Sequence, residues 1–329
     1  MKKIIVVLMV LLVAAPAFAV DMAKAKAEGT ANFYANITAV EPIMEAFNKA
    51  EGVEGVYTRI STSKYLATVV TEFDAGKLSA DVLQSPMPIM EILKEKGVFT
   101  PYRSPSAKGY PDWAQADDTI MQFGIEYVAP LYNKELVKPA DVPKTYMDLT
   151  DPKWKDKIVM PNPSTHATTI SWLVGLKENK IFGDDAGWDK FVKGLAANRP
   201  MFVRSFGPSP GPIESGEKLV GISMPKYIIT HAPAPLDWVR VDTILGTPRG
   251  IAIAAKAPHP EAGRMFMDYW LSKDAMQLLA NKVGEYVLAP GVYPPIEGIN
   301  KAKIVPLRSL TDDEIKEWGD KFKGIFEGM

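Results

Sequence analysis

Three consecutive strand–turn–helix units near the start of the chain constrain its fold more than any other feature. The apolar stretches 30–35, 55–60 and 80–83 each run into a polar turn, and a segment with apolar residues at helical spacing follows each turn. This alternation is typical of a parallel sheet with helices on its faces. In such sheets ligands bind outside the carboxyl ends of the strands. We therefore expect the three turns to face one crevice.

Residues 1–19 have the pattern of a secretory signal peptide. Lys2 and Lys3 precede an apolar run over 4–15, and Ala17-Phe18-Ala19 forms a small-x-small cleavage site. The run is too short to cross a bilayer. The sequence contains no cysteine, so disulfides, thiolate sites and a lipid-modified cysteine are excluded. We expect a soluble, exported protein located in the periplasm.

Charge and motif content exclude several classes of function. Removing Lys2 and Lys3 from the 38 basic residues leaves 36 against 39 acidic residues, a formal charge of −3. Without a basic excess, a nucleic-acid partner is not expected. The sequence has no Gly-x-Ser-x-Gly, no His-Glu-x-x-His, no phosphate loop and no Cys–His pair. We therefore expect neither an enzyme nor a cofactor.

Two long extended segments indicate a chain that passes between two lobes. Residues 119–133 read as one strand containing Gly124 and Pro130, whose length suggests that it leaves one lobe and enters another. The apolar stretch 251–255 has the composition of a strand that returns to the first lobe.

A further polar turn lies in residues 160–176. A short apolar strand runs through Pro161 and Pro163 into hydroxyl side chains, and an amphipathic helix follows. A helix N-terminus offers free N–H groups and the positive end of the helix dipole, which favour an anionic ligand group. Alternatively, these hydroxyls only cap the helix.

Several segments resemble bacterial extracellular solute-binding proteins of ABC importers, in the branch that holds ferric-ion, phosphonate and sugar-phosphate binding proteins. The resemblance extends over about 32–292 and is carried by segments 61–102, 132–136, 143–146, 149–158, 257–262 and 266–272. It implies an α/β, two-lobed periplasmic-binding-protein fold (type II) with two crossover strands and a ligand cleft between the lobes. The implied domains are 1–19 as signal peptide, 20–125 as the first part of lobe 1, 126–246 as lobe 2, and 247–329 as the second part of lobe 1 with the C-terminal helices.

The residues at one position of this resemblance bear on the ligand. Iron-binding members carry two adjacent tyrosines where this sequence has Lys226 and Tyr227. A lysine there repels Fe³⁺ and attracts an anion, and one phenolate is a poor start for an iron site. We therefore expect a periplasmic binding protein that captures a small anion (a phosphonate, phosphate ester or carboxylate) for import. The alternative is a ferric-iron-binding protein of an iron importer.

The candidate ligand-binding residues are polar side chains at predicted strand ends and helix starts. Arg59 and Arg204 could instead be surface ion-pair residues, Tyr34 could belong to the core, and His166 could only cap its helix. We expect no metal site, a membrane permease as partner and a monomeric protein. The candidates are Tyr34, Asn36, Arg59, Ser61, Thr62, Ser85, Ser164, Thr165, His166, Arg204, Ser205 and Tyr227.

Overall fold

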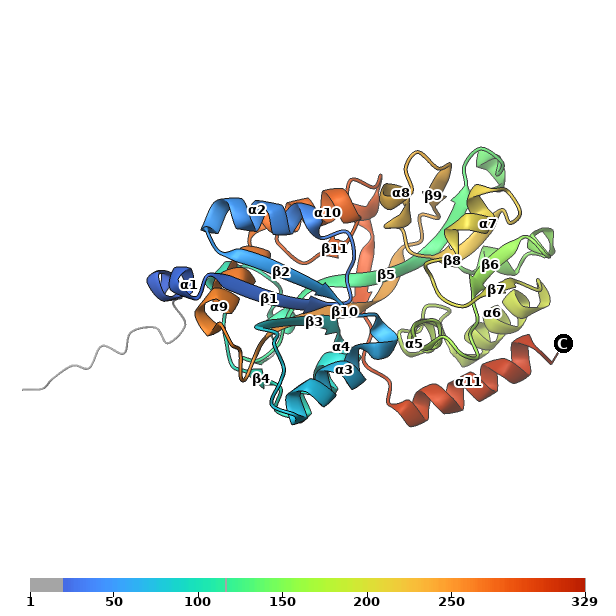
Figure 1. Ribbon diagram of the computed structural model, residues 1–329. Helices are drawn as coiled ribbons and strands as arrows, with labels where there is room; N and C mark the ends of the chain where they lie inside the picture. The colour runs from blue at the N-terminus through green and yellow to red at the C-terminus, as the bar shows by residue number, and fades with distance from the viewer. Residues whose placement is uncertain (1–19, 116, 329) are drawn as a thin grey trace, which may run out of the picture.

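The computed structural model describes residues 20–115 and 117–328 (Figure 1). The predicted signal peptide lies outside the described residues. Within these ranges, no helix has both the length and the apolar character needed to span a membrane. The elements form two lobes that lie side by side and are joined by two long strands.

The first lobe confirms the strand–helix alternation predicted for the N-terminal third. Strand β1 lies between β2 and β3 and is parallel to both, so the three carboxyl ends lie at the same edge. Helices pack on both faces of this sheet (Figure 1). The elements are α1 (Met22–Glu28), β1 (Thr30–Ala35), α2 (Glu41–Glu51), β2 (Glu54–Arg59), α3 (Thr62–Asp74), β3 (Val82–Pro86), α4 (Met87–Glu95), β4 (Phe99–Thr100), 3₁₀ turns η1 (Pro105–Ala107) and η2 (Asp112–Gln115), α9 (Pro260–Trp270), α10 (Lys273–Val283) and β11 (Tyr286–Val287).

The second lobe is built around a smaller sheet, in which β6 lies between β7 and β8 and is parallel to both. Its elements are 3₁₀ turns η3 (Pro139–Asp141), η4 (Met147–Thr150) and η5 (Pro152–Trp154), β6 (Ile158–Pro161), α5 (Ala167–Glu178), α6 (Asp185–Ala197), β7 (Met201–Val203), α7 (Pro210–Glu214), β8 (Val220–Ser223), α8 (Tyr227–Thr230) and β9 (Leu236–Trp238).

Strands β5 (Met121–Asn133) and β10 (Thr243–Ala254) connect the lobes. They pair with each other in antiparallel fashion, and the register shifts between Arg249 and Gly250. Beyond this pairing, β10 continues against β3 of the first lobe, whereas β5 continues against β8 and β9 of the second. The strand order β2-β1-β3-β10-β5-β8-β6-β7 therefore runs through both lobes, with the two crossing strands at its centre.

Each lobe has its own hydrophobic core. In the first, aromatic rings from β1 and α9 pack together, with Phe33 at 4.9 Å between ring centroids from both Phe266 and Trp270. In the second, Trp172 and Trp188 are fully buried among residues of α5, α6 and β6. Separate cores joined by two strands allow the lobes to move as units.

The C-terminal segment packs on the second lobe. It comprises η6 (Ile299–Lys301), β12 (Lys303–Pro306) and α11 (Asp312–Phe326), and α11 lies along α5 and α6 (Figure 1). Leu307, Leu310 and Phe322 are buried in the core of the second lobe. By its packing α11 thus belongs with the second lobe, because its apolar stripe is covered by α5 and α6, whereas the predicted division listed the C-terminal helices together with the second part of lobe 1 in 247–329.

Candidate functional site

A network of buried charged side chains lies where β5 and β10 join the lobes. Arg249 of β10 is 2% exposed and donates hydrogen bonds to Glu285 (3.3 and 3.4 Å), Glu126 (2.5 Å) and Asn36 (3.1 Å). Lys226 Nζ donates to the same Glu285 carboxylate at 3.0 Å. We call these five residues the Arg249 network. Its members come from the two crossing strands, from the end of β1, from the end of α10 and from the residue before α8, so the network connects the two lobes.

Local structure brings these side chains together. Glu126 projects from β5, the neighbour of β10, and Asn36 follows the last residue of β1. Glu285 follows Gly284, which ends α10 in the left-handed conformation (φ 72°) that glycine adopts without strain. Lys226 immediately precedes α8. The two cations and two carboxylates balance in charge, as burial of ionised groups requires.

The charged groups of the network alter the pKa values of their neighbours. Burial opposes ionisation of Glu285, but Arg249 and Lys226 outweigh it and hold the Glu285 pKa below its ordinary value. Burial, Glu126 and Glu285 raise the pKa of Tyr227, although Arg249 opposes the two carboxylates. The Tyr227 phenol therefore stays protonated at neutral pH and can donate a hydrogen bond.

Polar side chains gather at the carboxyl ends of β1 and β3. Asn36 Nδ2 donates to Thr62 Oγ1 at 2.9 Å, at the start of α3. Ser85 and Gln84, near the end of β3, are fully buried, and among the described residues neither Ser85 Oγ nor Gln84 Nε2 has a hydrogen-bond partner. Ser61 precedes α3 without capping it through its side chain. The strand ends of the first lobe thus hold two buried polar groups, Ser85 Oγ and Gln84 Nε2, that have bonding capacity to spare.

Two predicted residues of the first lobe lie elsewhere. The Tyr34 hydroxyl is hydrogen-bonded to Ser79 (2.7 Å), and the ring packs against the core beneath α3. Arg59 ends the edge strand β2 and is exposed, with no ion pair to any described residue. Tyr34 thus occupies the packing position that we considered as its alternative.

The start of α5 is engaged with its own lobe. Ser164 Oγ donates to Asn162 Oδ1 (2.7 Å) and to Glu327 Oε1 (2.9 Å), next to α11. His166 Nδ1 accepts from the Thr169 backbone N–H at 3.3 Å, and its ring lies edge-on to Phe206. These contacts correspond to the capping alternative. Thr165 is exposed.

Arg204 and Ser205 follow β7, the far edge strand of the sheet. Arg204 is exposed and forms no ion pair within the described part of the chain. The structure brings Asn36, Thr62 and Tyr227 to the junction of the lobes. Within the described residues, neither Arg204 nor Ser205 is hydrogen-bonded to any of these three.

Sequence reasoning missed Arg249, Glu126 and Glu285. The available signal was a lone charged residue within an otherwise apolar strand, which holds for Arg249 in 243–254 and for Glu126 in 121–133. Charged residues are rarely buried unless they are paired. The signal would have indicated buried ion pairs without naming the partners.

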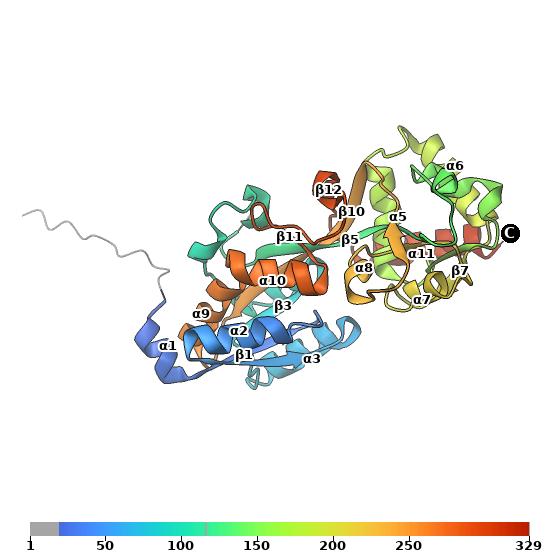
Figure 2. The same cartoon turned by 90° about the horizontal axis from the view of Figure 1, so that it is seen from above.

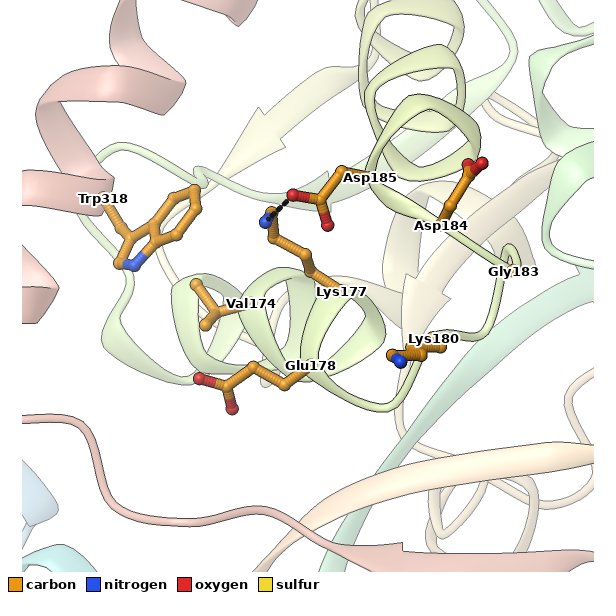
Figure 3. A pocket seen from close by; sticks show the side chains of 8 residues that line it. All are labelled: Val174, Lys177, Glu178, Lys180, Gly183, Asp184, Asp185 and Trp318. Atoms are coloured by element: carbon orange, nitrogen blue, oxygen red, sulfur yellow. Dashed lines mark hydrogen bonds and ion pairs between the residues drawn. The ribbon is translucent and has the colours of Figure 1, made fainter.

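A pocket of about 580 Å³ lies on the second lobe (Figure 3), and none of its lining residues belongs to the Arg249 network. Its Lys177 is already paired with Asp185 at 2.6 Å. We assign it no ligand, because its charged groups are exposed or paired and come from the end of α5, the start of α6 and the segment between them. The lining residues are Val174, Lys177, Glu178, Lys180, Gly183, Asp184, Asp185 and Trp318.

Burial lowers the pKa of His166 to about 4. Between this value and the ordinary 6.5, the unfolded chain binds a proton that the folded chain does not. Stability contributed by neutral His166 is therefore complete above about pH 6.5 and is lost as the pH falls toward 4. His166→Asn keeps an N-cap side chain but removes the titrating imidazole. Between pH 4.5 and 6.5, its melting temperature should therefore change less with pH than that of the unsubstituted protein. An unchanged pH profile would contradict this assignment.

Comparison with known proteins agrees with this architecture. The crystal structure of the substrate-binding protein of an ABC transporter from Agrobacterium tumefaciens superposes with a TM-score of 0.75 at 17% identity, covering 92% of this chain and 96% of that one. Residues 79–311 match the bacterial extracellular solute-binding protein family. The chain belongs to this family, and its two-lobed periplasmic-binding-protein fold is confirmed.

Two curated relatives are similar over most of the chain. The probable ABC transporter periplasmic-binding protein y4fP of Sinorhizobium fredii is 27% identical over 61% of this chain and 58% of its own length. The putative 2-aminoethylphosphonate-binding periplasmic protein of Salmonella typhimurium is 26% identical over 70% of this chain and 68% of its own length.

Proposed function

We propose that this protein is the periplasmic substrate-binding component of an ABC importer and that it captures a small anionic solute. Family membership and the descriptions of both relatives support the transport role. The solute class is a phosphonate, phosphate ester or carboxylate. Export to the periplasm, delivery to a membrane permease, action as a monomer and the absence of catalysis are parts of the same proposal.

The observation that carries the site is the pair of unpartnered polar groups at the end of β3. Leaving a buried hydroxyl or amide unsatisfied costs about 1–3 kcal/mol. Ser85 Oγ and Gln84 Nε2 both have this spare capacity near Asn36, which follows β1, and Thr62, which begins α3. Such groups in native structures call for an explanation, and ligand capture supplies one.

From the predicted set we retain Asn36, Ser61, Thr62 and Ser85 on the first lobe and Tyr227 on the second. Lys226 keeps ammonium donors beyond its bond to Glu285, and Tyr227 offers a protonated hydroxyl. Both suit an anionic ligand group. Exposed Thr165 and Arg204 and half-buried Ser205 remain candidates on the second lobe. In the closed arrangement of the lobes, both sets would contact one solute.

Two features favour an anion over ferric iron. Lys226 places a cation beside Tyr227, with its Nζ at 5.9 Å from the centre of the Tyr227 ring. The raised pKa of Tyr227 disfavours the phenolate that Fe³⁺ binds. Purified protein mixed with ferric citrate should stay colourless. A stoichiometric coloured complex that Tyr227→Phe abolishes would select the iron alternative.

A melting-temperature screen against phosphonates, sugar phosphates and carboxylates tests the anion proposal. A ligand at 100 times its Kd adds about 2.7 kcal/mol of stability, which should raise the Tm by about 5 °C. Ser85→Ala should then weaken binding by about fivefold, the loss of one neutral hydrogen bond, without destabilising the ligand-free protein. Ser215→Ala, an exposed position on the second lobe, is the control. If no anion raises the Tm at millimolar concentration, the proposal is wrong.

A further inference from the structure

The contact between Lys226 and Glu285 joins the two lobes. Lys226 precedes α8, whose Tyr227, Ile228 and Ile229 pack against the core of the second lobe. Glu285 follows α10, whose Val283 is buried in a core of the first lobe. Figures 1 and 2 both place α8 beside α10. The ion pair therefore bridges two helices that belong to different lobes.

At this contact the backbone of Gly284 lies close to the backbone of Lys226. A Cβ atom on Gly284 would lie 2.9 Å from both Cα and the carbonyl oxygen of Lys226, closer than real side chains permit. Gly284 also has φ +72°, a conformation that glycine favours. One glycine thus ends α10 and admits the α8 backbone against it, which holds the Lys226 ammonium within reach of Glu285.

The burial of the two partners is unequal. The Glu285 side chain is 1% exposed and also accepts from Arg249, whereas the Lys226 side chain is 14% exposed and has no other ion-pair partner in the described chain. If the lobes separated here, Glu285 would keep Arg249 as its counter-charge and Lys226 would move into water. Separation therefore breaks one charge-assisted bond without stranding a buried charge. Such a contact can open reversibly.

We infer that the Lys226–Glu285 pair is a latch that holds the lobes together before ligand arrives. This inference rests on the closure of two lobes in the proposed function. Losing one charge-assisted bond should shift the ratio of open to closed molecules by about ten- to a hundredfold. The latch would thereby set how much of the ligand's binding energy is needed for closure.

Distances between spin labels on the two lobes test the latch in ligand-free protein. The chain has no native cysteine, so Lys49→Cys on α2 and Lys190→Cys on α6, both exposed, accept labels cleanly. Pulsed electron paramagnetic resonance should show a predominantly short distance in the parent protein. Lys226→Met and Lys226→Gln should each move the population toward longer distances. Lys94→Met, which removes an exposed ion pair with Asp117 within the first lobe, should leave the distribution unchanged.

Two results would overturn the latch: a parent protein that is already open without ligand, or identical distributions in the parent and in both Lys226 variants. Circular dichroism of the variants establishes that they are folded before the distances are compared. Because no ligand is present, failure of the latch leaves the anion screen unaffected. Conversely, a screen without any binding anion would refute the proposed function and leave the distance measurement valid.

Discussion

Arg249→Met should lower the free energy of unfolding by about 3–5 kcal/mol, the cost of removing one partner from a buried ion pair. Arg249 is 2% exposed and donates hydrogen bonds to Glu126, Glu285 and Asn36. Without it, Glu285 would keep only Lys226, and the Glu126 carboxylate would lose its only ion-pair partner among the described residues. Urea-induced unfolding followed by circular dichroism measures the loss.

A matched variant at an exposed arginine shows how much of the expected stability loss is due to burial of the ion pairs of Arg249. Arg103 pairs with Asp118, and both side chains are about half exposed, so Arg103→Met should cost less than about 1 kcal/mol. Neutralising the stranded carboxylate in Arg249→Met/Glu126→Gln should recover part of the stability. A loss below about 1 kcal/mol in Arg249→Met would show that water reaches the network.

The network also predicts a pH dependence. Arg249 and Lys226 hold the folded-state pKa of Glu285 below its ordinary value, despite opposing burial. The stability that ionised Glu285 contributes is therefore present above its unfolded pKa and is lost as the pH falls through the folded value. In Glu285→Gln, this acid-side loss should disappear.

The fold was largely predictable because its signals are local. The strand–helix alternation over 30–95 lies in the periodicity of the sequence, and β5 stands out by its length. The packing position of the C-terminal helix is not a local property, because it depends on which lobe has an uncovered apolar surface. The amphipathic pattern of Asp312–Phe326 indicates a buried face without indicating the element that covers it.

The site was less predictable because its contacts are distant in sequence. Arg249 is 123 residues from Glu126 and 213 from Asn36, and no periodicity encodes such pairs. The hydroxyl cluster before α5 has the composition of an anion site, but Ser164 is bonded to Glu327, 163 residues away. Composition indicates what a side chain can bind, whereas the partner that it binds is decided by packing.

The second large effect is expected at Gly246, where β10 passes β5 between the lobes. A Cβ atom there would lie 2.4 Å from the Glu126 carbonyl oxygen and 2.7 Å from Tyr127 Cα. Both are backbone atoms of a paired strand, so relief requires β5 and β10 to move apart. Gly246→Ala should therefore lower the free energy of unfolding by about 3 kcal/mol, at the upper end of overpacking costs.

Gly324→Ala is the control: the same substitution is expected to change the free energy of unfolding in the opposite direction. Gly324 lies within α11, and a Cβ atom there would meet nothing within 4 Å. Alanine in a helix interior is favoured over glycine by about 0.5–1 kcal/mol, so this variant should be more stable than the parent. Urea unfolding of both variants decides the matter. If the free energy of unfolding of Gly246→Ala were within about 1 kcal/mol of the parent value, the two crossing strands would separate at little energetic cost. The lobes could then move relative to each other without a defined hinge.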